Sequence, residues 1–199
     1  MKKLGILGGT FNPVHLGHRQ IADYFATAIP LDEVLIIPAG APPHKDYIGS
    51  VSDIHRMEMC KIAFNSPLYH ISDIELKRSG KSYTVDTLRE LRRERPEDKL
   101  YFIMGADMFL SFKQWKEFEA ILELAAICAA PREGQAAECL HSYAQAPELA
   151  GGQFYIAEQS FAQISSTQVR NLLASGGDVS SLIDMQVLEY IKLNKLYEV

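Results

Sequence analysis

The sequence predicts an α/β fold in which helices cover both faces of a doubly wound parallel sheet. Short apolar runs alternate along the chain with amphipathic segments, and several of these runs have no polar face. Strands that are apolar on both faces are typical of parallel sheets, because helices cover both sides of such sheets. The length of 199 residues, with 47% hydrophobic and 23% charged side chains, suits one globular domain over residues 1–199.

The first part of the chain is expected to alternate between buried strands and helices. The run Leu4–Leu7 ends in glycines, as a strand ends at a turn. Apolar residues then recur with a helical period from Leu16 to Ile29, and Pro30 stops that helix. The elements expected here are a strand at 4–7, a helix at 16–29, a strand at 34–37, a helix from 52 to about 65 and an alternating strand at 70–76.

The second part of the chain continues the alternation. Thr84 begins a helical pattern that ends before Pro96, and two further runs are apolar throughout. Residues 132–150 show no pattern clear enough to assign. The elements expected here are a helix at 84–95, a strand at 100–104, a helix at 115–124, strands at 125–130 and 153–157, and helices from 166 and from about 184.

Charge and cysteine content exclude several classes of protein. The net charge of −5 argues against a protein that coats nucleic acid. The signs alternate along Arg89–Arg95, which is typical of a solvated, salt-bridged helix surface. Cys60, Cys128 and Cys139 are too few and too scattered for a disulfide framework or a zinc site, so we expect reduced thiols.

The sequence also predicts a cytoplasmic protein with neither a membrane nor a nucleic acid as partner. The apolar run after Lys2 and Lys3 ends at once in glycines, so it lacks the apolar region of a signal peptide. No stretch is long and apolar enough to span a bilayer.

The strongest functional signal is the segment Gly8–His18, which follows the first strand and opens the first helix. Gly8 and Gly9 allow a tight turn and a close approach to a ligand. The start of the helix presents unpaired N–H groups to an anion, and His15 and His18 share one helix face. The segment therefore predicts a phosphate-binding turn.

Other phosphate and metal motifs fit this segment less well. A dinucleotide fingerprint needs Gly-x-Gly-x-x-Gly and an acidic residue after the second strand, whereas that strand ends in Ile37-Pro38-Ala39. A phosphate loop needs Gly-Lys-Ser/Thr, which is absent here. A metal held by His15 and His18 would need further ligands, and none lies nearby in the sequence.

The segment Gly-Gly-Thr-Phe-Asn-Pro-x-His-x-Gly-His resembles the signature of the nucleotidyltransferases whose core motif is His-x-Gly-His. Segments 42–45, 81–88, 105–107 and 164–170 are similar to those of the bacterial nicotinate-nucleotide adenylyltransferases. Asn12 departs from that pattern, because many members carry Asp there, and Lys116 stands where many carry an aromatic residue. The resemblance implies a Rossmann-like nucleotidyltransferase fold that transfers AMP from ATP to nicotinate mononucleotide in NAD biosynthesis.

The resemblance also implies roles for individual residues. Backbone groups near Thr84 and Lys116, with the ring of Trp115, would hold the pyridine ring of the mononucleotide. The C-terminal helices, about 166–199, would complete the ATP site. The residues expected to bind the nucleotide are Gly8, Gly9, Thr10 and Phe11 after the first strand, Gly105 and Asp107 at the adenosine ribose, and Ser166, Thr167, Gln168 and Val169 at the phosphates.

Several of these residues also have a purely structural interpretation. Ser165 with Gln168 fits a helix capping box, and Asp107 fits a helix N-cap. A single tryptophan such as Trp115 is commonly a core anchor, and a lysine such as Lys45 is commonly a solvated loop residue. Lys45 nevertheless follows the end of the second strand, where parallel sheets bind ligands.

The expected reaction is a direct displacement, because the attacking group is already a phosphate. His18 would stabilise charge on the α-phosphate and His15 would position the phosphates. Lys45 and Arg170 would neutralise the leaving pyrophosphate. Mg²⁺ is expected to arrive with ATP, with no metal site built by the protein. Two alternatives remain, a transferase with another acceptor and a nucleotide sensor without activity, and the chain is expected to be a monomer or a homodimer.

Overall fold

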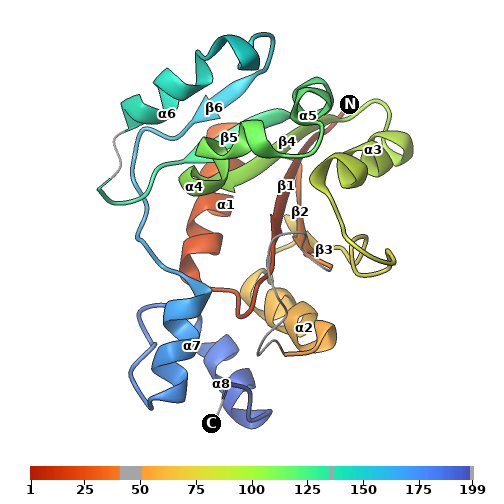
Figure 1. Ribbon diagram of the computed structural model, residues 1–199. Coiled ribbons are helices and arrows are strands. Elements are labelled where there is room, and N and C mark those ends of the chain that lie inside the picture. Colours follow the sequence, from red (N-terminus) through yellow and green to blue (C-terminus); the bar gives the residue numbers. More distant parts are fainter. Residues whose placement is uncertain (41–50, 135–136, 198–199) are drawn as a thin grey trace.

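A computed structural model describes residues 1–40, 51–134 and 137–197 of the protein. It contains one six-stranded sheet, in the order β3-β2-β1-β4-β5-β6, and every pair of neighbouring strands is parallel. This arrangement confirms the predicted doubly wound α/β fold (Figure 1). The strands are β1 (Lys3–Gly9), β2 (Glu33–Pro38), β3 (Tyr69–Ile71), β4 (Lys99–Gly105), β5 (Ala126–Ala130) and β6 (Phe154–Ile156).

Helices bury an apolar core on each face of the sheet. One core joins α1, α2, α7 and α8, and the other joins α3, α4, α5 and α6. Two single-turn 3-10 helices, η1 and η2, precede α5 and β6. The helices are α1 (Leu16–Ala28), α2 (Asp53–Ala63), α3 (Thr84–Glu94), α4 (Ala106–Leu110), η1 (Phe112–Gln114), α5 (Phe118–Leu124), α6 (Ala137–Ala144), η2 (Pro147–Leu149), α7 (Ser166–Ala174) and α8 (Met185–Leu193).

The structure differs from the sequence prediction in three elements. The strand expected at 70–76 is only the three residues of β3, which pairs with β2 alone; β2 ends at Pro38, which has no N–H to continue the ladder. The helix expected from Trp115 begins at Phe118, because Glu117 has a left-handed backbone with φ of 51°. Helix α6 lies in the stretch left unassigned.

The strand order places a topological switch point between β1 and β4. The chain leaves β1 toward β2 on one side, and later strands are added on the other side of β1. Open α/β sheets bind ligands in the crevice outside the carboxyl ends of their strands at this point. In Figure 1, α7 and α8 lie beyond the same end of the sheet, with α8 against α2.

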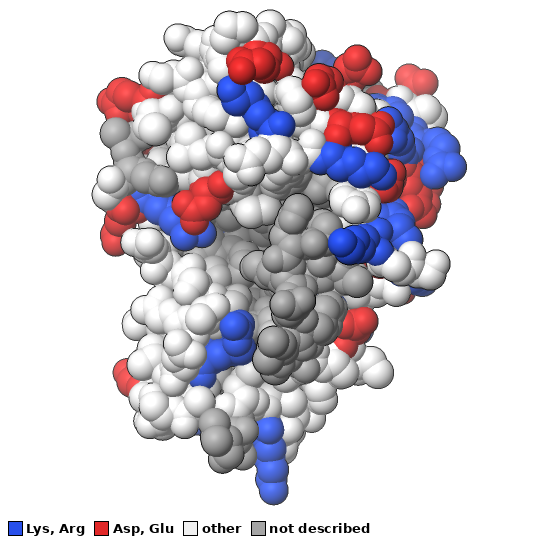
Figure 2. Space-filling model, in the orientation of Figure 1, with Lys and Arg blue, Asp and Glu red and all other residues white. Residues whose placement is uncertain are grey.

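The charged helix α3 has the salt-bridged surface that its sequence predicts. Arg89 pairs with Glu117 at 2.6 Å, and Arg95 pairs with Glu33 at 2.7 Å. Figure 2 shows acidic and basic side chains interleaved over this part of the molecule. Within the described part of the chain, no helix has the length and apolar character that crossing a membrane requires.

Candidate active site at the switch point of the sheet

Two glycines leave open space at the ends of the central strands. A Cβ at Gly8 would meet only Phe102, at 4.0 Å, and a Cβ at Gly105 would meet nothing within 4 Å. Neither glycine has a positive φ, so neither the backbone nor the internal packing requires glycine at these positions. The space they leave lies at the carboxyl ends of β1 and β4, where a ligand is expected.

His15 and His18 are brought together at the head of α1, directly beyond β1. Their rings stack with centroids 3.6 Å apart, and the ring of Phe11 packs edge-on against His18 at 4.8 Å. The Nδ1 atom of His18 accepts the backbone N–H of His15 at 3.2 Å, which assigns the proton of a neutral His18 ring to Nε2. The backbone thus fixes the orientation of the second histidine.

His15 is neutral at physiological pH. Burial, and then the positive charge of Arg132, lower its pKa from 6.5 to about 4. Its Nδ1 atom is buried and has no hydrogen-bond partner among the described residues. The ring lies over Gly17, where a Cβ would stand 3.1 Å from Nδ1, so a residue larger than glycine would displace it. A neutral His15 can form hydrogen bonds but carries no positive charge.

The start of α7 contacts the loop between β1 and α1. Ser165 caps α7 by accepting the N–H of Gln168 at 3.1 Å, as predicted. Ser166 Oγ donates to the carbonyl of Pro13 at 2.8 Å. Arg170 donates to the carbonyl of Asn12 at 2.7 Å and to Thr167 Oγ1 at 3.1 Å. The two segments are far apart in sequence, and the structure places them together at the head of α1.

The remaining members of the α7 group differ in exposure. Thr167 and Gln168 are exposed, whereas the side chain of Val169 is fully buried in the core with α1 and α8. The N–H of Val169 donates to the carbonyl of Ser165. The side chain of Val169 therefore packs in the core.

Asp107 lies in the first turn of α4, beside Gly105. Its carboxylate does not cap the helix; it pairs with Arg132 at 2.8 Å. Arg132 follows β5, and its charge also acts on His15. The charge of Arg132 therefore acts both on Asp107 in α4 and on His15 at the head of α1.

The aromatic and charged residues expected around a pyridine ring form a second group. The ring of Trp115, which is half-buried, packs against Phe102, the same ring that faces Gly8. Nζ of Lys116 lies 4.4 Å from the ring centroid of Tyr83 and 3.3 Å from the carboxylate of Asp86. Tyr83 is the N-cap residue of α3, so Thr84 is the first residue of that helix.

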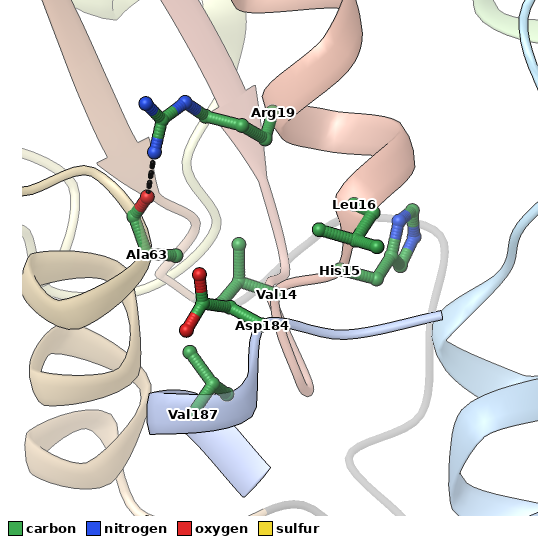
Figure 3. A pocket seen from close by; sticks show the side chains of 7 residues that line it. All are labelled: Val14, His15, Leu16, Arg19, Ala63, Asp184 and Val187. Atoms are coloured by element: carbon green, nitrogen blue, oxygen red, sulfur yellow. Dashed lines mark hydrogen bonds between the residues drawn. The ribbon is translucent and has the colours of Figure 1, made fainter. Parts of the chain in front are cut away.

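Lys45 lies outside the described residues, as does most of the loop that carries it. In Figure 2, Lys and Arg side chains lie at several points around the central part of the face shown. A cavity of about 20 Å³, lined in part by His15, lies where α1, α2 and α8 meet (Figure 3). That volume is enough for one water molecule. There Arg19 donates to the carbonyl of Ala63, near Asp184 and Val187. The cavity is therefore a small packing gap between these helices.

The cytidylyltransferase-like family model matches residues 6–172 of this chain. The chain belongs to the cytidylyltransferase-like family. A relative from Geobacter metallireducens, named "probable nicotinate-nucleotide adenylyltransferase", is 39% identical over 98% of both chains. A relative of the same name from Trichlorobacter lovleyi is 44% identical over 90% of this chain and 84% of its own.

Solved structures resemble this cytidylyltransferase-like chain over its full length. The nicotinic acid mononucleotide adenylyltransferase of Plasmodium falciparum complexed with NaAD has a TM-score of 0.82. The sequence identity is 22%, and the match covers 99% of this chain and 98% of the other. At that identity the likeness establishes the fold. It agrees with the sheet order and with the switch point described above.

Three residues near the site of this cytidylyltransferase-like chain were not predicted from sequence. Arg132 is the first residue of the unassigned stretch, although its place directly after a strand was a usable signal. Tyr197 donates its hydroxyl to Asn12 Oδ1 at 2.8 Å from the far end of the chain. Arg56 is fully buried on α2 and donates to the carbonyl of Thr10. A charged residue inside an otherwise amphipathic helix gave no sign of its buried position.

Proposed function

We propose that this protein transfers AMP from ATP to nicotinate mononucleotide, forming nicotinate adenine dinucleotide and pyrophosphate. The observation that carries the proposal is the stacked pair His15 and His18 at the head of α1, beyond the open ends of β1 and β4. Curated relatives that match nearly the whole chain carry the name of this activity.

In the proposed reaction, a phosphate oxygen of the mononucleotide attacks the α-phosphorus of ATP. A new P–O bond forms, the bond between the α-phosphorus and the bridging oxygen breaks, and pyrophosphate leaves with the electron pair. A phosphate is a competent nucleophile at neutral pH, so neither a general base nor a covalent intermediate is required. The protein must hold two polyanions in line and offset their repulsion.

The phosphate-binding groups divide this task. His18 would donate from Nε2 to the α-phosphate as charge develops there, and neutral His15 would position the phosphates by a hydrogen bond. Arg170 and Lys45 would neutralise the leaving pyrophosphate. The loop Gly8–Phe11 and the exposed start of α7, at Ser166–Gln168, would supply the remaining contacts to ATP.

The two nucleoside ends would bind on either side of the phosphates. Asp107, with Gly105 beside it, would accept hydrogen bonds from the adenosine ribose, and Arg132 would hold its carboxylate in place. Trp115 would stack on the pyridine ring. Backbone N–H groups near Thr84 and Lys116 would face the carboxylate of that ring. On this proposal the C-terminal helices complete the ATP site of one nucleotidyltransferase domain.

Mg²⁺ would enter this site together with ATP. Among the described residues, no group of three or more His, Cys, Asp or Glu side chains is arranged to hold a metal ion. The nearby carboxylate of Asp107 is paired with Arg132. Phosphate oxygens and water would therefore supply the ligands, and the ion would screen the negative charge of the triphosphate.

We further propose that the protein works in the cytoplasm, as a monomer or a homodimer. Cys60 and Cys128 are buried free thiols, and burial raises the pKa of both. Inert thiols of this kind fit a reducing compartment.

The proposal is tested by the release of pyrophosphate from ATP and Mg²⁺ with three acceptors: nicotinate mononucleotide, nicotinamide mononucleotide and phosphopantetheine. A strong preference for the first is the expected result. A preference for either of the others keeps the phosphate chemistry and refutes the proposed acceptor. If the folded protein binds ATP and releases no pyrophosphate with any acceptor, a nucleotide sensor replaces the enzyme.

A further inference from the structure

The side chain of Arg56, on α2, is fully buried although it carries a positive charge. It is the one Lys, Arg, Asp or Glu side chain in the described part of the chain that is fully buried. Burying a guanidinium is costly unless its donors are satisfied. A carboxylate partner among the described residues, Asp53, is half-exposed and lies 2.6 Å from Nη2. The burial of Arg56 is therefore explained by its other hydrogen bonds.

Those contacts are two backbone carbonyls at the carboxyl ends of adjacent strands. Nη1 of Arg56 donates to the carbonyl of Thr10 at 2.7 Å, directly after β1. Nη2 donates to the carbonyl of Ala39 at 2.8 Å, directly after β2. Thr10 belongs to the proposed phosphate loop, and Ala39 begins the connection that leads to Lys45. One side chain thus joins both loops from the side of α2.

The contact between Arg56 and the carbonyl of Thr10 also sets the direction of the N–H group that follows this carbonyl. In a trans peptide, the C=O and the following N–H point in opposite directions. With the carbonyl of Thr10 held by Arg56, the N–H of Phe11 points away from the guanidinium. No described residue accepts a hydrogen bond from Phe11 N–H. A cation on the carbonyl also polarises the peptide, which strengthens its N–H as a donor.

We propose that Arg56 is a positioning residue for the triphosphate of ATP. It orients the peptide after β1 so that the N–H of Phe11 faces the phosphates, it holds the start of the connection after β2, and its buried charge adds to the positive potential there. The inference rests on the proposed function only in placing a triphosphate beside the β1 loop; the identity of the acceptor does not enter it.

The test compares Arg56→Lys with a matched substitution elsewhere. Lysine keeps the charge but cannot bridge two carbonyls and a carboxylate. Arg92 on α3 holds backbone carbonyls in the same way, donating to Asp98 at 2.5 Å and to Leu124 at 2.9 Å, at the amino ends of β4 and β5. Arg92→Lys therefore controls for the structural cost of losing an arginine that holds backbone carbonyls.

Three dissociation constants are measured by calorimetry, together with melting temperature. For Arg56→Lys, the Kd of ATP and the Kd of inorganic tripolyphosphate are expected to rise by about tenfold or more, the scale of a lost charged hydrogen bond. The Kd of nicotinate mononucleotide is expected to change less than about twofold. Arg92→Lys is expected to lower the melting temperature without changing any of the three constants. A folded Arg56→Lys protein with wild-type affinity for ATP and tripolyphosphate overturns the proposal.

A second measurement needs no variant and so does not depend on Arg56→Lys folding. In the ¹⁵N-labelled wild-type protein, the Phe11 amide resonance is followed as tripolyphosphate is added. A saturable downfield proton shift at Phe11 is expected, because its N–H then donates to phosphate. No shift at Phe11 while tripolyphosphate binds refutes the orientation. The deciding results, the Kd of ATP, the Kd of tripolyphosphate and the Phe11 shift, are measured without an acceptor, so failure of the proposed acceptor specificity would leave them intact.

Discussion

The low pKa of His15 makes the stability of the protein depend on pH in a way that one substitution should remove. Burial and Arg132 lower this pKa from 6.5 to about 4 in the folded protein, while the unfolded chain keeps the ordinary value of about 6.5. At pH 7 both states are mostly neutral at this site. As the pH falls below 6.5, the unfolded chain takes up a proton that the folded protein does not, so stability is lost.

The magnitude follows from the two pKa values. Between pH 6.5 and pH 4, each pH unit costs about 1.4 kcal/mol, so His15 alone lowers the free energy of unfolding by about 2 kcal/mol between pH 7 and pH 5. The loss levels off at about 3 kcal/mol below pH 4, where the folded protein also becomes protonated. His15 is only 8% exposed, so solvent screens this effect little.

The assay is urea denaturation of the wild-type protein and of His15→Gln at pH 5, 6 and 7. Glutamine does not titrate, so the stability of the variant relative to wild type should rise by about 2 kcal/mol from pH 7 to pH 5. His70→Gln, at an exposed position of β3, is the control and should follow the wild-type pH dependence. If His15→Gln keeps the same pH dependence as wild type, His15 is not the buried neutral group described here.

Three further substitutions test the site. His18→Ala should lower kcat by at least ~10²-fold in steady-state assays, the scale of losing one transition-state donor, and an unchanged kcat would remove His18 from the mechanism. Gly17→Ala places a Cβ 3.1 Å from His15 Nδ1 and should lower kcat on the order of tenfold by moving the ring; wild-type turnover would show that the ring tolerates the methyl group. Tyr197→Phe removes the hydroxyl that donates to Asn12 and should cost about 1 kcal/mol of unfolding free energy in urea; no loss would show that this contact does not hold the C-terminal segment.

The parts of the fold that depend on local pattern were predictable from sequence. The apolar runs that became β1, β2, β4 and β5 are each buried on both faces, and Ser165 caps α7 as its spacing indicates. The histidines were found because His15 and His18 belong to one contiguous strand–turn–helix segment. In such segments the residues that act together are also neighbours in sequence.

The parts that depend on distant contacts were not predictable. Tyr197 reaches Asn12 across 185 positions, and Arg56 reaches Thr10 across 46. Neither residue belongs to a local motif. The length of β3 was overestimated because its sequence alternates beyond the point where its only partner, β2, ends in Pro38. The ion pair of Asp107 with Arg132, in place of an N-cap, likewise depends on how β5 lies beside β4.

The measurement that tests the central claim most directly is the stoichiometry of the reaction. Purified protein is incubated with ATP, Mg²⁺ and nicotinate mononucleotide, and the products are quantified by chromatography and mass spectrometry. The account predicts nicotinate adenine dinucleotide and pyrophosphate in equal amounts, with His18→Ala slower by the factor given above. Formation of AMP without the dinucleotide, or no product from a folded protein that binds both substrates, would contradict it.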